Sequence, residues 1–97
     1  MYAAILQLSF PPERHDEVVR FLCEEMMAVI RDNDGFVDFR VLDAGAAGEL
    51  VIIDTWNRRE DAVAAMRRSS AQAVHERYAE MNITVVSAKR YSVLATS

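Results

Sequence analysis

The chain has 97 residues, 52% of them hydrophobic, and a formal net charge of -4. Its charges are scattered without a basic stripe, which argues against nucleic acid or an anionic membrane as a partner. The single cysteine, Cys23, excludes an intrachain disulfide and a cysteine-rich zinc site. We expect one domain over residues 1–97, no metal, and residence in the cytoplasm, because the N-terminal MYAAILQLSF is too short and too alternating for a signal peptide or a membrane span.

A change of hydrophobic period predicts a strand followed by a helix. Residues 1–10 alternate, and one face of this strand carries Tyr2, Ala4, Leu6, Leu8 and Phe10. Pro11 and Pro12 end the strand and suit the first turn of a helix over about 13–32. The apolar arc of that helix should hold Val18, Val19, Leu22, Cys23, Met26, Val29 and Ile30. Phe21 lies off this arc, so we expect it at the surface, as a dimer contact or a tolerated exposed aromatic.

A hairpin is expected in the middle of the chain. Asn33, Asp34 and Gly35 stop the helix, and Gly35 can take the left-handed conformation that such stops favour. Residues 36–42 then alternate, with an apolar face of Val37, Phe39 and Val41. The loop 43–49 leads into a strand that is apolar on both faces, with the sequence Leu50, Val51, Ile52 and Ile53. Such a strand needs packing on each side, and the helices of one short chain cover only one.

The only tryptophan, Trp56, ends this strand and precedes a helix. We expect Asn57 to cap the helix, with Glu60 reaching back to the cap amide as in a capping box. The inner side of the helix should carry Ala62, Val63 and Met66. The last side chain of a strand often faces a cleft at such a corner, where ligands bind. Packing as a core anchor is an equally good interpretation of Trp56.

A second helical segment and a long strand complete the chain. Ser69 or Ser70 should cap the segment, whose inner face carries Ala71, Val74, Tyr78 and Met81, with His75 at its edge. The last strand follows over about 83–94. The order β-α-β-β-α-β is that of an α+β ferredoxin-like fold with an antiparallel sheet. Right-handed crossovers place both helical segments on one sheet face, so we expect the bare apolar face to pair with a second copy in a homodimer.

The order of elements, the acid-x-Trp sequence of Asp54 and Trp56, and the Met-Asn-Ile sequence at 81–83 resemble the antibiotic biosynthesis monooxygenase (ABM) family of dimeric α+β barrel proteins. The resemblance covers nearly the whole chain and implies a homodimer with a pocket between the helices and the sheet of each subunit. Members include cofactor-independent oxygenases of polyketide-derived phenols and quinols, haem-degrading enzymes, and proteins of unknown substrate.

The chain departs from this family at positions where many members carry chemistry. Many members place a histidine ten residues after the tryptophan, where this chain has Met66, and a second one where it has Ala71. The haem-degrading branch requires an asparagine on the first strand, where only Gln7 offers an amide, and the quinone-forming branch has one at the position of Ile52. The resemblance therefore disfavours haem degradation and implies no cofactor. Of the family residues that carry chemistry, only the tryptophan is matched in this chain, by Trp56.

Oxygenation without a metal or flavin requires a substrate that forms an electron-rich anion, and so a base and a dry aromatic pocket. His75 is the natural base by its ordinary pKa, although a histidine at the rim of a helix is often only a solvated surface residue. Asp54 can act as a base or orient a donor if it is buried, and the bland alternative is a strand-end surface acid. Tyr78 and Arg90 can bind a phenolate oxygen, although Arg90 is also explained as a dimer contact.

We therefore predict a cofactor-independent monooxygenase acting on an aromatic polyketide-type or quinol substrate. Its predicted catalytic residues are His75 and Trp56, and its predicted substrate-binding residues are Tyr78, Asp54, Arg90 and Met66. The alternative is a binding or regulatory protein that kept the dimer and the pocket without the chemistry, which Met66 and Ala71 in place of histidines favour.

Overall fold

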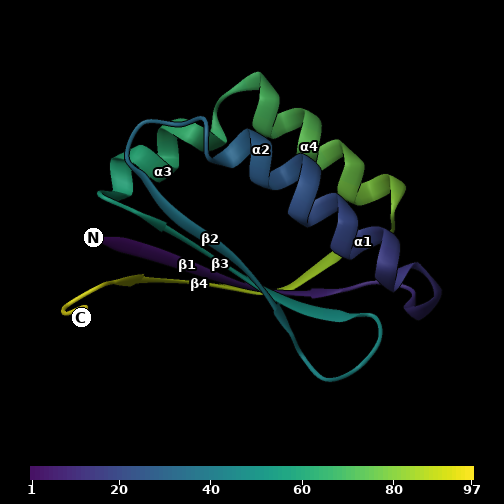
Figure 1. Cartoon of the computed structure of the whole chain (residues 1–97). Coiled ribbons are helices and arrows are strands. Elements are labelled where there is room, and N and C mark those ends of the chain that lie inside the picture. The colour runs from purple at the N-terminus through teal and green to yellow at the C-terminus, as the bar shows by residue number, and fades with distance from the viewer.

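In a computed structural model that describes residues 1–97, the chain forms one sheet with helices on one face (Figure 1). The strands are β1 (Tyr2–Ser9), β2 (Phe36–Asp43), β3 (Glu49–Trp56) and β4 (Thr84–Ser92). They pair antiparallel in the order β2-β3-β1-β4. The helices are a 3-10 turn (Pro12–Arg14), α1 (His15–Phe21), a π-helical turn (Leu22–Met26), α2 (Met27–Ile30), α3 (Arg59–Met66) and α4 (Ser69–Glu80). The predicted α+β ferredoxin-like order is confirmed.

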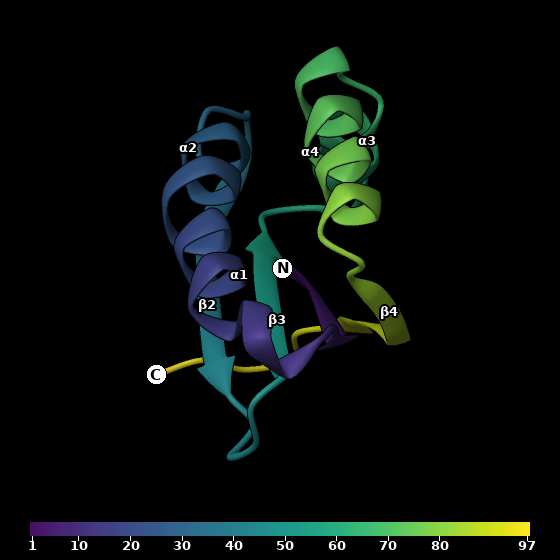
Figure 2. The ribbon, with the colours of Figure 1, turned by 90° about the vertical axis from the view of Figure 1, so that its right-hand side faces the viewer.

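Two columns of helices share one sheet face, with α1 and α2 in one column and α3 and α4 in the other (Figure 2). No element of the chain covers the opposite face (Figure 1). Strand register places apolar side chains on that bare face, namely Ile5, Leu42, Val51, Ile53 and Tyr91. Two of them are widely exposed, Leu42 by 41% and Tyr91 by 48%. The homodimer that would cover this face stays a prediction.

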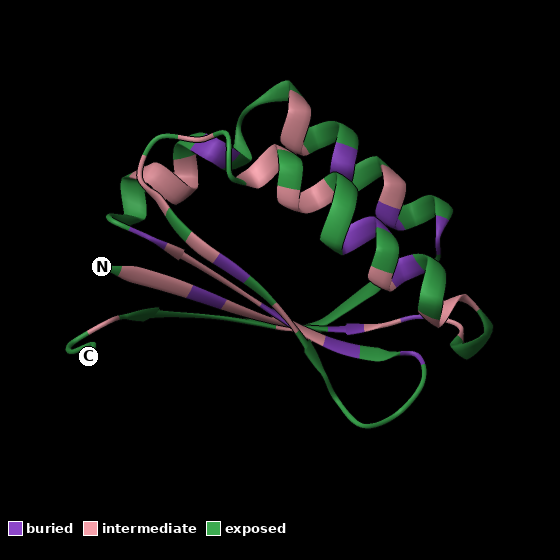
Figure 3. Cartoon of the chain, viewed as in Figure 1, coloured by how far each residue is buried: buried purple, intermediate pink, exposed green.

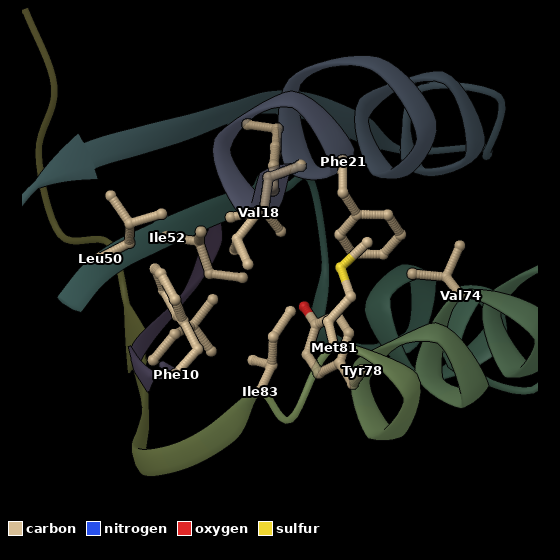
Figure 4. Packing of buried hydrophobic residues seen from close by; sticks show 12 residues of the cluster. Phe10, Val18, Phe21, Leu50, Ile52, Val74, Tyr78, Met81 and Ile83 are labelled. Atoms are coloured by element: carbon tan, nitrogen blue, oxygen red, sulfur yellow. The ribbon is translucent and has the colours of Figure 1, made fainter. Parts of the chain in front are cut away.

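The core lies between the sheet and the helices, where buried residues line the surfaces that face each other (Figure 3). Val18 and Leu22 of the first helical column have no exposed surface. They pack over Leu8, Leu50 and Ile52 of the sheet, and the close-up shows Val18 among the strand residues Leu50 and Ile52 (Figure 4). This packing fixes the distance between the layers at one end of the molecule.

Phe21 belongs to the core with 3% exposure, so its predicted surface position is wrong. That prediction assumed a regular helix, but a π-helical turn follows α1, marked by the hydrogen bond from the Met27 N–H to the Leu22 carbonyl. A π turn holds one extra residue and shifts the phase of everything after it. One continuous face can therefore carry Val18, Phe21, Leu22, Met26, Val29 and Ile30. Cys23, which the prediction placed in the apolar arc, is exposed.

Both predicted side-chain caps are wrong. The N-cap of α3 is Arg58, without a side-chain cap hydrogen bond, in place of the expected pair of Asn57 and Glu60. The Asn57 N–H donates to the Gly35 carbonyl over 2.8 Å. This bond holds Asn57 beside the start of β2, so the helix begins only at Arg59. The N-cap of α4 is Arg68 in place of Ser69 or Ser70. Its guanidinium donates to the Asp32 carbonyl (3.0 Å) and to Asn33 Oδ1 (2.8 Å), so a long-range contact holds the start of α4.

A bulge in β2 corrects the predicted apolar face of that strand. Phe36 pairs with Trp56 and Asp38 pairs with Thr55, so Val37 is an extra residue and is 39% exposed. Phe36 takes the inner position instead, edge-on to Trp56 with ring centroids 5.7 Å apart. The inward positions of Phe39 and Val41 are confirmed, as are the hairpin of β2 and β3 and the left-handed Gly35.

Candidate active site

A cavity of about 350 Å³ lies between the sheet and the helices beside Trp56. Fifteen of its twenty lining residues are hydrophobic. This volume lies near the lower end of the usual range for small-molecule sites, about 300–1,000 Å³, and the apolar lining is typical of them. The cavity draws residues from the π-helical turn, from α2, α3 and α4, and from β1, β3 and β4.

The floor of the cavity is a row of side chains that crosses the sheet. Register aligns Asp54, Ala4 and Arg90 from β3 through β1 to β4, and all three line the cavity. Ala4 is buried at 7% exposure, and its methyl group is smaller than the side chains of Tyr2 and Leu6 beside it on this face of β1. The short Ala4 side chain leaves room above it, with an acid on one side and a guanidinium on the other.

Trp56 forms part of the cavity wall and is also a core anchor, with 2% exposure. Its indole Nε1–H donates to Asp54 Oδ2 over 2.6 Å. The two residues are two positions apart on β3, so their side chains leave the same face of the strand. Both interpretations of Trp56 from the sequence therefore hold together, because the indole packs against Phe36 and leaves the cavity open.

The carboxyl of Asp54 is the most perturbed acid of the site. Burial raises its pKa, and the hydrogen bonds from Trp56 and from its own backbone, together with the positive charge of Arg90, offset this only partly. Asp54 takes part in none of the protein's five salt bridges. A carboxyl with a raised pKa in an apolar cavity can accept a proton from a ligand more readily than a surface acid can.

The hydroxyl of Tyr78 is a poised hydrogen-bond donor. Burial, and then the charge of Asp54, raise its pKa well above the ordinary value for tyrosine, so it stays protonated. The hydroxyl donates to the Met26 sulfur over 3.2 Å. A thioether is a weak acceptor, so an oxygen of a ligand would be the better partner. The ring is fixed edge-on between Phe21 and His75, at centroid distances of 5.9 and 5.7 Å.

The structure brings all six predicted site residues to this one cavity, although at different depths. Trp56, Asp54 and Tyr78 lie inside, while His75 and Arg90 are exposed at its edge. Met66 was expected to face inward, but it is 54% exposed at the rim, and the buried position on α3 belongs to Ala65 instead. The roles assigned to these residues remain predictions.

Of the twenty lining residues, fourteen were not among the six predicted, and four of these bear on the shape or polarity of the cavity, namely Ala4, Met26, Asn33 and Arg67. Ala4 had a usable signal, since it is the small member of an otherwise large apolar face of β1. Met26 was assigned to the core, because nothing in its spacing shows that its sulfur meets a tyrosine hydroxyl. Asn33 and Arg67 carry no sequence signal for the site.

No group of three or more His, Cys, Asp or Glu side chains is arranged to hold a metal ion. None of the helices is long and apolar enough to cross a membrane.

Residues 1–77 match the family model described as antibiotic biosynthesis monooxygenase. The chain belongs to the ABM family. No curated protein matches the chain. Among solved structures, HapK from Hahella chejuensis is similar with a TM-score of 0.85 and 20% identity, covering 100% of this chain and 96% of that one. A provisionally assigned antibiotic biosynthesis monooxygenase from Deinococcus radiodurans has a TM-score of 0.86 and 16% identity over 100% and 96%.

A third ABM-like structure is SnoaB from Streptomyces nogalater, described as a cofactor-independent oxygenase. Its TM-score is 0.77 at 13% identity, covering 98% of this chain and 94% of that one. Identities this low establish a shared fold. The ABM domain of this chain thus has its fold and its family defined, while its substrate is not identified by these relatives.

Proposed function

We propose that this ABM protein is a cofactor-independent monooxygenase that acts on an aromatic polyketide-type or quinol substrate in the cavity beside Trp56. The observation that carries the proposal is an apolar cavity whose wall holds a carboxyl of raised pKa next to a protonated tyrosine donor. The family assignment supports it, as does the shared fold with SnoaB, which is described as a cofactor-independent oxygenase.

For an anthrone-type substrate the reaction needs only molecular oxygen as oxidant. A base removes a proton from the methylene carbon, and the resulting anion passes one electron to oxygen. The two radicals combine, with uptake of a proton, as a hydroperoxide, which loses water to leave a carbonyl group. In total the carbon loses two hydrogens and gains one oxygen atom, and the second oxygen atom leaves as water.

Each proposed role follows from the position of the side chain. His75 at the mouth has no hydrogen-bond partner in the protein, so its ring is free to take a proton from a substrate. Trp56 supplies a dry aromatic wall, and its N–H is already bound to Asp54. Tyr78 and Arg90 can stabilise a developing phenolate oxygen, and Met66 covers the rim.

A non-catalytic binding or regulatory role is the second candidate. It is favoured by Met66 and Ala71, where many family members have histidines, and by the exposed His75, whose ring no hydrogen bond orients. A base without an orienting partner is a weaker catalyst than one held in place. The cavity itself serves both candidates equally well.

Oxygen uptake separates the two candidates. The purified protein would be mixed with a panel of anthrones and hydroquinones, beside His75→Ala, Trp56→Phe and the control His15→Ala. His15 is the only other histidine and lies outside the cavity, where its Nδ1 accepts the Gly48 N–H over 3.0 Å. An uptake above the spontaneous rate that falls in either cavity variant, but not in the control, supports the oxygenase. Uptake equal to the buffer blank for all substrates favours the binding protein.

We also propose a homodimer that buries the bare sheet face. Its apolar side chains, such as the exposed Leu42 near the end of β2 and the partly buried Ile53 in the middle of β3, support this arrangement. Light scattering after size exclusion should give twice the chain mass of 11.0 kDa. Ile53→Glu should shift the mass toward the monomer, while Ala73→Glu on the exposed side of α4 should not. A wild-type mass equal to that of one chain at micromolar concentration would contradict the proposed dimer.

A further inference from the structure

Two opposite charges flank Ala4 on the floor of the cavity. Asp54 and Arg90 are the residues paired with Ala4 on either side, so all three leave the same face of the sheet. Neighbouring strands lie about 4.8 Å apart, which separates the two backbones by roughly 10 Å. Neither side chain takes part in any of the protein's five salt bridges. An acidic and a cationic side chain, neither of them in a salt bridge, therefore face one apolar cavity from positions that suit the two ends of a flat ligand.

The remaining polar groups of the cavity leave this pair as the main recognition elements. The side-chain amide of Asn33 already has hydrogen-bond partners within the protein. Its Nδ2 donates to the carbonyls of Val29 (3.1 Å) and Ile30 (2.8 Å), and its Oδ1 accepts from Arg68. His75 and Arg67 are exposed on the helix side of the mouth. Besides Asp54 and Arg90, the polar groups that line the cavity are the hydroxyls of Tyr78 and Tyr2. The Tyr78 hydroxyl is close enough to Asp54 for the charge of that carboxylate to raise its pKa, whereas Tyr2 leaves the sheet opposite Trp56.

The chemistry of these groups specifies both ends of a ligand. The Tyr78 hydroxyl donates and the Asp54 carboxylate accepts, and a hydroxyl group on a ligand is the simplest function that can accept from one and donate to the other. An ammonium group would satisfy Asp54 but leave Tyr78 on its weak sulfur acceptor. At the other end, the Arg90 guanidinium favours an anionic oxygen, which it can bind with two N–H groups.

We propose that the cavity recognises an aromatic anion that carries a hydroxyl group at its opposite end. The anionic oxygen lies at Arg90, the ring lies over Ala4, and the hydroxyl lies between Tyr78 and Asp54. This inference rests on the proposed function only in placing the ligand in this cavity, and it makes no use of the oxygen chemistry. The volume of about 350 Å³ favours one or two fused rings within the cavity, with any larger skeleton extending past the mouth.

Calorimetric titration with four naphthalenes tests the two ends separately. The probes are 6-hydroxy-2-naphthoate, 2-naphthoate, 2-naphthol and 2,6-dihydroxynaphthalene. The hydroxynaphthoate should bind at least about fivefold more tightly than either compound that lacks one end, as expected for the loss of one hydrogen bond to a charged or buried group. The dihydroxy compound tests whether a phenolate can replace the carboxylate as the anionic group. If it can, the affinity for this compound should rise with pH as the compound ionises.

Variants assign each end to its residue. Arg90→Gln should lower the affinity for the hydroxynaphthoate to that for 2-naphthol, while the control Lys89→Gln, on the opposite face of the same strand, should leave it unchanged. Tyr78→Phe should lower it toward that for 2-naphthoate. Equal affinities for all four probes, or a loss caused by Arg67→Gln in place of Arg90→Gln, would overturn the inference.

The outcome is separable from that of the proposed function. Two-ended binding without oxygen uptake on any substrate would leave this inference standing and remove the monooxygenase. Oxygen uptake without any preference among the four probes would do the reverse. In either case Trp56, the only tryptophan and part of the cavity wall, gives a check on location, because its fluorescence should change on binding.

Discussion

The two ends of the helix–sheet layer are built from the same strands but packed differently. At the filled end, defined by Leu8, Phe10, Val18 and Leu22, each of these side chains is at most 6% exposed. At the hollow end, defined by Ala4, Asp54, Trp56 and Tyr78, a cavity of about 350 Å³ remains. Strand β1 passes through both, with Leu8 at one end and Ala4 at the other. The size of the β1 side chain, Leu8 at one end and Ala4 at the other, thus decides whether the space between helices and sheet is filled or remains a cavity.

The difference separates stability from binding. The filled end excludes water and carries no polar side chain, which is what maximises the free energy gained by burial. The hollow end places a carboxyl and a hydroxyl in an apolar environment, and the raised pKa values of Asp54 and Tyr78 record that cost. A site of this kind depends on the other end for its rigidity.

The largest expected effect is on the filled end. Leu8→Ala should lower the free energy of unfolding by about 2–5 kcal/mol, because Leu8 is 2% exposed and removal of its side chain leaves a cavity in the core. Urea denaturation measures the change. The matched control is Leu42→Ala on the bare face, where the side chain is 41% exposed and the loss in a monomeric state should be below about 1 kcal/mol. Equal losses in the two variants would mean that the filled end is not the stabilising half.

The reverse exchange at the hollow end should act on binding instead. Ala4→Leu places a larger side chain into open space, so the free energy of unfolding should change by less than about 1.5 kcal/mol. The affinity for 6-hydroxy-2-naphthoate should fall below detection, because the floor is raised between its two polar ends. Ala73→Leu, on the exposed side of α4, is the control and should bind normally. Retained binding in Ala4→Leu would place the ligand elsewhere.

A smaller effect is expected from the tyrosine hydroxyl. Tyr78→Phe removes a donor whose present partner is only the Met26 sulfur, so the free energy of unfolding should change by less than about 1 kcal/mol. The affinity for a hydroxylated ligand should nevertheless fall about 2- to 12-fold, which corresponds to one neutral hydrogen bond. Titration of both proteins with the same ligand measures this ratio. A stability loss without an affinity loss would assign the hydroxyl to the core alone.

The subtlest effect is the pH dependence of stability at Asp54. Its pKa in the folded protein is raised above the ordinary value of 3.8 that applies to the unfolded chain. The folded state therefore binds the proton more tightly, and this contribution to stability is fully present below the unfolded pKa and is lost as pH rises through the folded pKa. Asp54→Asn keeps an acceptor for the Trp56 N–H but does not titrate.

The difference in unfolding free energy, Asp54→Asn minus wild type, should therefore rise as the pH increases from below 3.8 through the folded pKa, and then level off. Urea denaturation at several pH values measures it, and subtraction of the wild-type curve removes the other carboxyl groups that both proteins share. A difference that stays flat or falls over this range would mean that burial does not dominate the environment of Asp54.

Most of the fold could be predicted because it follows from local periodicity. Alternation set the face of β1, the left-handed Gly35 marked the turn before β2, and the order of elements left one ferredoxin-like topology. What failed were features that depend on contacts distant in sequence or on a local change of phase. The bulge at Val37 and the start of α4 at Arg68 belong to the first kind, since a partner strand and the end of α2 determine them.

The candidate site could be predicted only in part. The acid-x-Trp sequence located Asp54 and Trp56 on one strand face, and helical spacing put Tyr78 and His75 near them. Depth could not be predicted, since the exposure of Met66 and the burial of Ala65 depend on how α3 is rotated over the sheet. The hollow above Ala4 is likewise a property of three strands together, and no single segment encodes it.

The π-helical turn at Leu22–Met26 also bears on how this chain compares with its relatives. Because the turn holds one residue more than a regular helix needs, a chain without Glu24, which is exposed, would keep Val18, Leu22 and Met26 in line on an ordinary helix. Homologues that differ in length by one residue here can share every inward-facing position. An ungapped alignment of such chains would pair inward residues with outward ones on one side of the turn, so the gap belongs inside this helix.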